Sequence, residues 1–443
     1  ISSLSFASVA GAVAWMWKRF SDGGDLMTGV LYGLVIAFNW MWLEGFYNFT
    51  LGLAGYALAL GFLAKWDRLD LARTSLLAML AVLVYFSHQM CFGALAFSVL
   101  LMAGLSASKG RWRNIALSVA ALLPAVVLLV VYVYTRSGHS AGALEWSNLK
   151  SGSVTGWLTQ LRTANPFMIV LTRNLPFSKA SSYAPIFAPV VWIFAAIVCL
   201  FLGKRSVAAN DERVVAARRW RPIFAALLFI FIAGALFAPD ALAGGSVIRP
   251  RMTLFASIAL VPLIVGSAKG IFRNVATVTL AVVFAFQCVA MWDYALTTSA
   301  DAGELLAAAD NVEDGQGIAA VTVTPSVLRY PTDPLIHVDG FMTGTRSVVA
   351  WDVYETSLMS FPVIARSDED RAFISRLNND SVIDRADPDA IVRLARDLDE
   401  GHDRIVMLAV WNGDESVRDA LEKWYEPVPA RSQGRAEIFR RRP

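Results

Sequence analysis

The chain has 443 residues, of which 56% are hydrophobic and only 17% are charged, and its formal net charge at pH 7 is +3. A soluble globular protein has roughly one quarter of its residues charged, so this composition excludes an ordinary soluble domain. The small net charge also excludes the basic surface of a nucleic-acid-binding protein. We therefore expect an integral membrane protein that contacts membrane lipids and has no nucleic-acid partner.

Apolar runs long enough to cross a bilayer core of roughly 30 Å recur along the first two thirds of the chain. Two of them, 26–66 and 74–105, are too long for one helix, so a turn must divide each. Glu44-Gly45 interrupts the first run, and Ser87-His88-Gln89 interrupts the second. The pattern predicts about ten spans, at 1–17, 26–43, 47–64, 74–86, 89–106, 114–135, 184–203, 222–238, 251–267 and 275–295.

Lysine and arginine gather in alternate connections, at 18–19, 65–73, 109–113, 204–221 and 269–273. The turns at Glu44 and His88 contain neither residue type. The positive-inside rule places the basic connections in the cytoplasm, so we expect Glu44, His88 and the C-terminal tail on the external side. Residue 1 is then external too. We therefore expect an upstream helix and external loop, giving eleven or more spans in full.

The composition changes after Thr297, where Asp and Glu become frequent and apolar runs shorten. We predict a transmembrane helical domain at 1–297 and an external soluble α/β domain at 298–443. The fold class is thus an α-helical polytopic membrane bundle with a small external α/β domain. The external loop 136–183 mixes aromatic and polar residues and is expected to lie in the interface, as a lid or as a packing element. In the tail we predict strands at 317–323, 404–410 and 436–440, and helices at 388–398 and 416–424.

Two polar residues in the outer turns are candidates for chemistry. Glu44 is flanked by aromatic residues, and a carboxylate at a membrane boundary is costly unless it is solvated or paired. It is either a functional group (a general base, a metal ligand or an acceptor for sugar hydroxyls) or a solvated turn residue. His88, in the second outer turn, would bind a phosphate or orient a base, or would be an ordinary polar turn residue. Both are kept as candidate catalytic residues.

A third cluster of candidates concerns an anionic donor. Arg249 and Arg251 lie just before an outer helix, and guanidinium groups suit bidentate binding of phosphate. The alternative is ordinary contact with lipid headgroups. Asn48, in the turn after Glu44, is grouped with these arginines as a donor-binding candidate. No residue is assigned as a metal ligand, and the sequence leaves open whether a divalent metal takes part.

Several of these segments resemble GT-C-type polytopic membrane glycosyltransferases and their uncharacterised bacterial relatives. The resemblance lies in Gly45-Phe46-Tyr47-Asn48-Phe49-Thr50-Leu51-Gly52-Leu53, in the turn Tyr85-Phe86-Ser87-His88, in Arg249-Pro250-Arg251, and in Asp333-Pro334-Leu335-Ile336-His337 of the tail. It implies a helical bundle with an external domain and a sugar donor linked to polyprenyl phosphate. It also implies that Arg249 or Arg251 binds the donor phosphate and that His88 lines the site. The family's catalytic acid, in its first external loop, would precede Ile1.

The expected activity is the transfer of a sugar from a polyprenyl-phosphate donor to an acceptor on the external face. The expected location is a bacterial inner membrane, with the C-terminal domain periplasmic or extracellular. One alternative is a non-catalytic membrane subunit that docks a protein partner through 298–443. A second is a transporter, but the predicted spans are nearly free of charge, whereas transporters often place charges at mid-membrane.

Overall fold

The computed structural model describes residues 1–21, 26–63, 69–105, 110–136, 212–239, 247–265, 271–324, 347–351, 367–384, 389–401, 403–428 and 435–443. Two compact units emerge from the contacts among them, Ile1–Ala290 and Met291–Pro443. The predicted loop 136–183 beyond residue 136, the predicted span 184–203 and the segment 333–337 lie outside the described residues.

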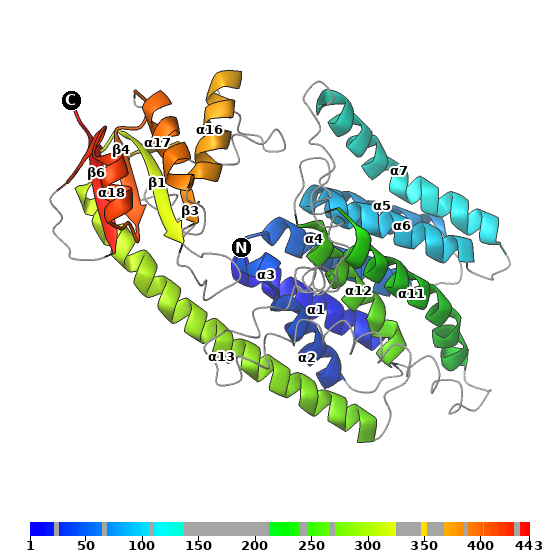
Figure 1. The fold of residues 1–443 in the computed structure, drawn as a ribbon. Coiled ribbons are helices and arrows are strands. Elements are labelled where there is room, and N and C mark those ends of the chain that lie inside the picture. The colour runs from blue at the N-terminus through cyan, green and yellow to red at the C-terminus, as the bar shows by residue number, and fades with distance from the viewer. Residues whose placement is uncertain are drawn as a thin grey trace. The chain divides into compact units, whose positions relative to one another are not determined.

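The first unit is helical (Figure 1). Its described helices are α1 Ser2–Phe20, α2 Leu26–Ala37, α3 Trp40–Leu43, α4 Tyr47–Leu63, α5 Leu71–Ser87, α6 Gln89–Leu105, α7 Arg111–Arg136, α11 Glu212–Phe237 and α12 Ile248–Val265. The long helix α13, Ile271–Ala308, begins in this unit and ends in the second. Within the described ranges, four helical stretches are long and apolar enough to cross a membrane: Arg111–Tyr134, Trp220–Phe237, Ile248–Val265 and Arg273–Ala308.

Helix α1 packs along both α2 and α4 at the centre of this unit. Glycine allows the close approach of α2, because a Cβ atom built on Gly33 would lie only 2.5 Å from the carbonyl oxygen of Ala10. Gly29, one turn earlier, similarly faces the side chain of Trp17. Small residues four apart are the usual device by which membrane helices bring their backbones together.

The predicted span 26–43 is not one helix. It breaks after α2, and Asn39 explains the break, since its side-chain oxygen accepts a hydrogen bond from the backbone N–H of Trp42 at 3.1 Å and so caps α3. The amide nitrogen of Asn39 donates to two of the last carbonyls of α2. Gln287 of α13 donates to two more carbonyls at the same break, at 3.1 and 3.2 Å. The break is therefore hydrogen-bonded by protein groups although it is buried.

The second unit is a mixed sheet covered on both faces. Its strands are β1 Gly317–Thr324, β2 Val349–Ala350, β3 Val382–Asp384, β4 Met407–Trp411, β5 Tyr425–Pro427 and β6 Ala436–Arg441. The main order is β2-β1-β4-β6-β5, and β3 also pairs with β1. β2, β3 and β4 run parallel to β1, whereas β6 is antiparallel to its neighbours β4 and β5.

Alternation along the central strands divides the core into two layers. Ala319, Val321 and Val323 of β1 pack in a cluster with α16 (Asp368–Asp380), α17 (Ala390–Glu400) and α18 (Glu415–Leu421). Ile318 instead packs in a second cluster with Leu305 and other residues at the end of α13. β1 and β4 are thus buried on both sides, which is why they read as continuous apolar runs.

The predicted elements of the tail are present with shifted ends. The strands predicted at 317–323, 404–410 and 436–440 correspond to β1, β4 and β6, and the helices predicted at 388–398 and 416–424 correspond to α17 and α18. Helix α16 was not predicted, although Ser367 accepts a hydrogen bond from the backbone N–H of Asp370 as a helix cap. Helix α13 contains the predicted span 275–295 and continues beyond it to Ala308, where Leu305 is buried in a core cluster of the second unit.

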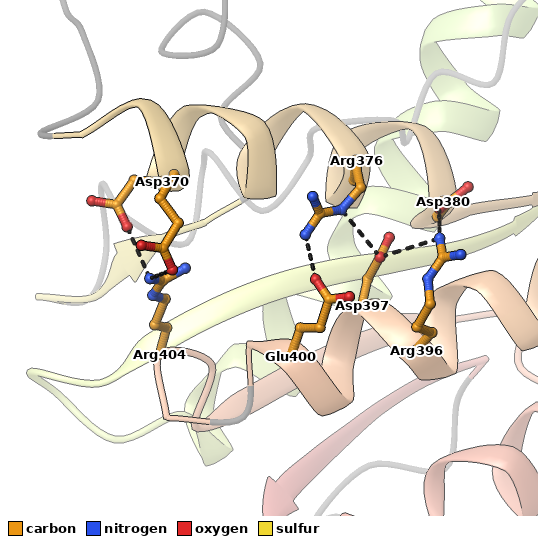
Figure 2. Close-up of polar contacts among 8 residues, drawn as sticks. Asp370, Arg376, Asp380, Arg396, Asp397, Glu400 and Arg404 are labelled. Atoms are coloured by element: carbon orange, nitrogen blue, oxygen red, sulfur yellow. Dashed lines mark hydrogen bonds and ion pairs between the residues drawn. The ribbon is translucent and has the colours of Figure 1, made fainter.

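A network of charges joins α16 to α17 (Figure 2). Asp397 is fully buried, with Nε of Arg376 3.5 Å and a guanidinium nitrogen of Arg396 3.6 Å from its carboxylate. Arg376 also pairs with the exposed Glu400. Burial, and then the nearby Asp380, raise the pKa of Asp397 from 3.8 to about 6. Ionisation of this carboxyl group is therefore less favourable in the folded unit than in the unfolded chain.

This shift predicts a pH dependence of local stability. Because the folded pKa of Asp397 lies above its unfolded value, its stabilising contribution is complete below about pH 4 and is lost as the pH rises through 6. The loss is at most about 3 kcal/mol. Asp397→Asn should remove this dependence and leave amide hydrogen exchange of α16 and α17 no faster than in the wild type at pH 7.5.

The control is Glu400→Gln, which removes an exposed partner of Arg376 and should keep the pH dependence. Faster exchange in the Asp397→Asn variant at pH 7.5 would mean that the ion pairs outweigh the cost of burying the charge.

Candidate functional site

His88 occupies the turn between α5 and α6 and caps the start of α6. Its Nδ1 atom accepts a hydrogen bond from the backbone N–H of Met90 at 3.2 Å. Its ring meets the ring of Phe49 edge-on, with centroids 5.2 Å apart at 86°. Burial, and then the charge of Arg251, lower the pKa of His88 from 6.5 to about 3. The imidazole is therefore neutral at pH 7.

Arg251 lies in the first turn of α12 and is 5% exposed. Its guanidinium carbon is 5.1 Å from the ring centroids of both Phe46 and Phe49. Its Nη1 atom is 3.3 Å from Nε2 of His88. Aromatic faces attract a cation, and desolvation strengthens the attraction. The structure thus brings His88 and Arg251 into contact from positions far apart in the sequence.

Three helix N-termini meet at this guanidinium. Phe46 directly precedes α4, His88 directly precedes α6, and Arg251 belongs to the first turn of α12. Each N-terminus carries a partial positive charge of roughly half an elementary charge. Together with the guanidinium group they make this place favourable for an anion, because backbone dipoles and the side chain act with the same sign.

Arg249 has a different environment. It is 2% exposed, and its Nε atom donates to the carbonyl of Ala235 at 3.0 Å, with a second guanidinium nitrogen 3.5 Å from the carbonyl of Leu236. Both carbonyls lie in the last turn of α11, where a cation compensates the negative helix end. Residues two apart on a helix point in different directions. Arg249 therefore stabilises the end of α11, while Arg251 faces the aromatic cluster.

Glu44, on the turn that carries Phe46, and Asn48, in the first turn of α4, are both exposed. Glu44 ends α3, and Gly45 follows with φ +82°, a conformation that favours glycine. The side-chain oxygen of Asn48 accepts a hydrogen bond from the backbone N–H of Phe49 at 2.8 Å. This tight turn sets the position of Phe46 over the guanidinium group.

The aromatic wall of the site was not predicted. Phe46 and Phe49 were noted only as part of a family resemblance, and a single sequence does not show which ring a cation will meet. The described residues contain no group of three or more His, Cys, Asp or Glu side chains that could hold a metal ion.

No protein-family model matches the chain, and no curated protein matches it. The chain is similar to two crystal structures of ArnT from Cupriavidus metallidurans, one in the apo state and one bound to undecaprenyl phosphate. Each is 12% identical, over 99% of this chain and 82% of the ArnT chain, with TM-scores of 0.36 and 0.35.

The environment of Arg249 predicts a structural role. Arg249→Ala should remove the groups that cap α11 and lower the free energy of unfolding by about 1–3 kcal/mol, measured as thermal unfolding in detergent. Arg111→Ala, at an exposed position on α7, is the control and should have little effect. An Arg249→Ala protein with unchanged thermal stability would contradict the capping role.

Proposed function

We propose that this protein is a membrane glycosyltransferase that takes a sugar from a polyprenyl-phosphate donor and transfers it to an acceptor on the external side of a bacterial inner membrane. The observation that carries the proposal is the guanidinium group of Arg251, buried between two aromatic rings where three helices begin. A single phosphate on a long apolar chain fits this chemistry, because the anion meets the guanidinium group while the apolar chain stays among apolar helices.

In the proposed reaction an acceptor hydroxyl group attacks the anomeric carbon of the sugar. The bond from that carbon to the phosphate oxygen breaks, and the polyprenyl phosphate leaves with the bonding electrons. Arg251 stabilises the negative charge that develops on the leaving phosphate. The proton of the acceptor passes to a general base, for which the exposed carboxylate of Glu44 is a candidate. Asn48, in the first turn of α4, is a candidate contact for the sugar.

The break between α2 and α3 disfavours a transporter. In transporters, unwound backbone carbonyls at broken helices coordinate the transported ion. Here Asn39 and Gln287 donate hydrogen bonds to four carbonyls at the break. The protein's own amides occupy these carbonyls, so the break is better explained as a structural bend than as an ion site. Docking of a protein partner through 298–443 stays a prediction.

Removing the guanidinium group tests the binding half of the proposal. Arg251→Ala should weaken binding of undecaprenyl phosphate about 10- to 100-fold, since a hydrogen bond to a charged group contributes about 1.5–3 kcal/mol. Native mass spectrometry of the protein in lipid nanodiscs measures this affinity. Arg113→Ala, also in the first turn of a helix but exposed, is the matched control. Equal affinities of Arg251→Ala and wild type would remove Arg251 from the site.

Removing the carboxylate tests the chemical half. Glu44→Gln should slow consumption of a polyprenyl-phosphate sugar roughly 10²- to 10⁴-fold, the usual contribution of a general base, and leave undecaprenyl phosphate binding unchanged. Glu422→Gln, an exposed glutamate of the second unit, is the control. Full activity of the Glu44→Gln protein would place the base elsewhere. A wild-type protein that binds the lipid but transfers nothing would favour the non-catalytic subunit.

A further inference from the structure

Both ring nitrogens of His88 face N–H donors. The backbone N–H of Met90 lies 3.2 Å from Nδ1, and Nη1 of Arg251 lies 3.3 Å from Nε2. A neutral imidazole has one nitrogen that accepts and one that donates, and a guanidinium group only donates. The two contacts cannot both be ordinary hydrogen bonds. In one of them, a ring N–H group of His88 must face another N–H donor.

The geometry decides which contact that is. Met90 is the second residue of α6, so its N–H has no carbonyl partner within the helix and is held in place by the helix backbone. A side-chain acceptor at the residue before the helix normally satisfies such a group. Nδ1 of His88 supplies that acceptor, which leaves the proton on Nε2. The Nε2–H group then points toward the guanidinium nitrogen of Arg251.

An Nε2–H group that faces a guanidinium nitrogen at 3.3 Å cannot donate to it, so the imidazole needs a separate acceptor. The surroundings favour a negatively charged one, because the N-termini of α4, α6 and α12 and the guanidinium group add positive potential there. The ring of His88 cannot turn freely, since the edge-on contact with Phe49 and the bond from Met90 fix its plane.

We propose that His88 is a second ligand of the donor phosphate, holding through Nε2–H the same oxygen, or a neighbouring oxygen, that Arg251 binds. The inference rests on the proposed function. It adds the neutral Nε2–H group of His88, as a hydrogen-bond donor to the phosphate, to the charged guanidinium group of Arg251. His88 in this role binds and orients the leaving group; it does not act as the base. A phosphate with free terminal oxygens is the chemical class that such a pair recognises.

Two substitutions separate the two nitrogens of the ring. In His88→Asn the side-chain oxygen can still accept the N–H of Met90, but the side chain is too short to reach Arg251. In His88→Gln the amide NH₂ group reaches the place of Nε2, while the cap on α6 is weakened. We expect His88→Asn to weaken undecaprenyl phosphate binding about 10-fold and His88→Gln to stay within about threefold of wild type. Equal losses in both variants, or no loss in His88→Asn, would overturn the proposal.

The outcomes distinguish this inference from the function on which it rests. If Arg251→Ala loses binding and His88→Asn keeps it in full, only the proposed role of His88 is refuted, and the proposed site at Arg251 stands. Full binding in both refutes the proposed site as a whole. Competition with inorganic phosphate and with phosphatidylglycerol vesicles identifies the source of the phosphate. Displacement of undecaprenyl phosphate by ordinary phosphatidylglycerol at equal concentration would overturn the assignment to a terminal phosphate.

A spectroscopic measurement tests the tautomer directly. The chain has four histidines, and the His88→Asn variant identifies the signal of His88 in nitrogen NMR of histidine-labelled protein. We expect a neutral ring protonated at Nε2, whose signal shifts when undecaprenyl phosphate is added. A ring protonated at Nδ1 with no response to the lipid would contradict the proposal, because Nε2 would then be the acceptor for Arg251.

Discussion

The burial of one positive charge organises one end of the helical unit, where α4, α6 and α12 begin. Arg251 is almost removed from solvent, and burying a guanidinium group costs several kcal/mol unless other groups compensate. Phe46 and Phe49 supply part of the compensation through their ring faces. Because these rings lie at the start of α4 and the charge lies on α12, the interaction holds two distant segments together. It also places His88 beside the charge.

What the sequence could predict was the side on which these groups lie, not their contacts. Alternation of basic and uncharged connections put Glu44, His88 and the arginines at the same end of the helices. It could not predict that the ring of Phe49 would contact both His88 and Arg251. It could, however, have distinguished Arg249 from Arg251, because residues two apart on a helix do not face the same neighbour. The first arginine caps α11 and the second faces the aromatic rings.

In the second unit, too, the sequence predicted some elements but not the contacts between helices. β1 and β4 were predictable because a strand buried on both faces is a continuous apolar run. Helix α16 was missed because its sequence is dominated by charged and polar residues, and among its side chains whose burial the structure describes, only Phe373, Ile374 and Leu377 are buried. Some of its charged side chains pair with α17, as Arg376 of α16 does with the buried Asp397 of α17. Such pairing depends on how two helices pack, which the sequence of either helix does not reveal.

The contact between His88 and Arg251 joins residues that are 163 positions apart. A ribosome therefore completes α4, α5 and α6 long before it reaches α12. During that interval His88 and Phe49 are already made, but the arginine that contacts them both does not yet exist. The growing chain thus acquires this feature only late in its synthesis, when most of the described helices have been made. A newly made chain that stops short of α12 has His88 and the rings of Phe46 and Phe49 but lacks the guanidinium group that packs against them.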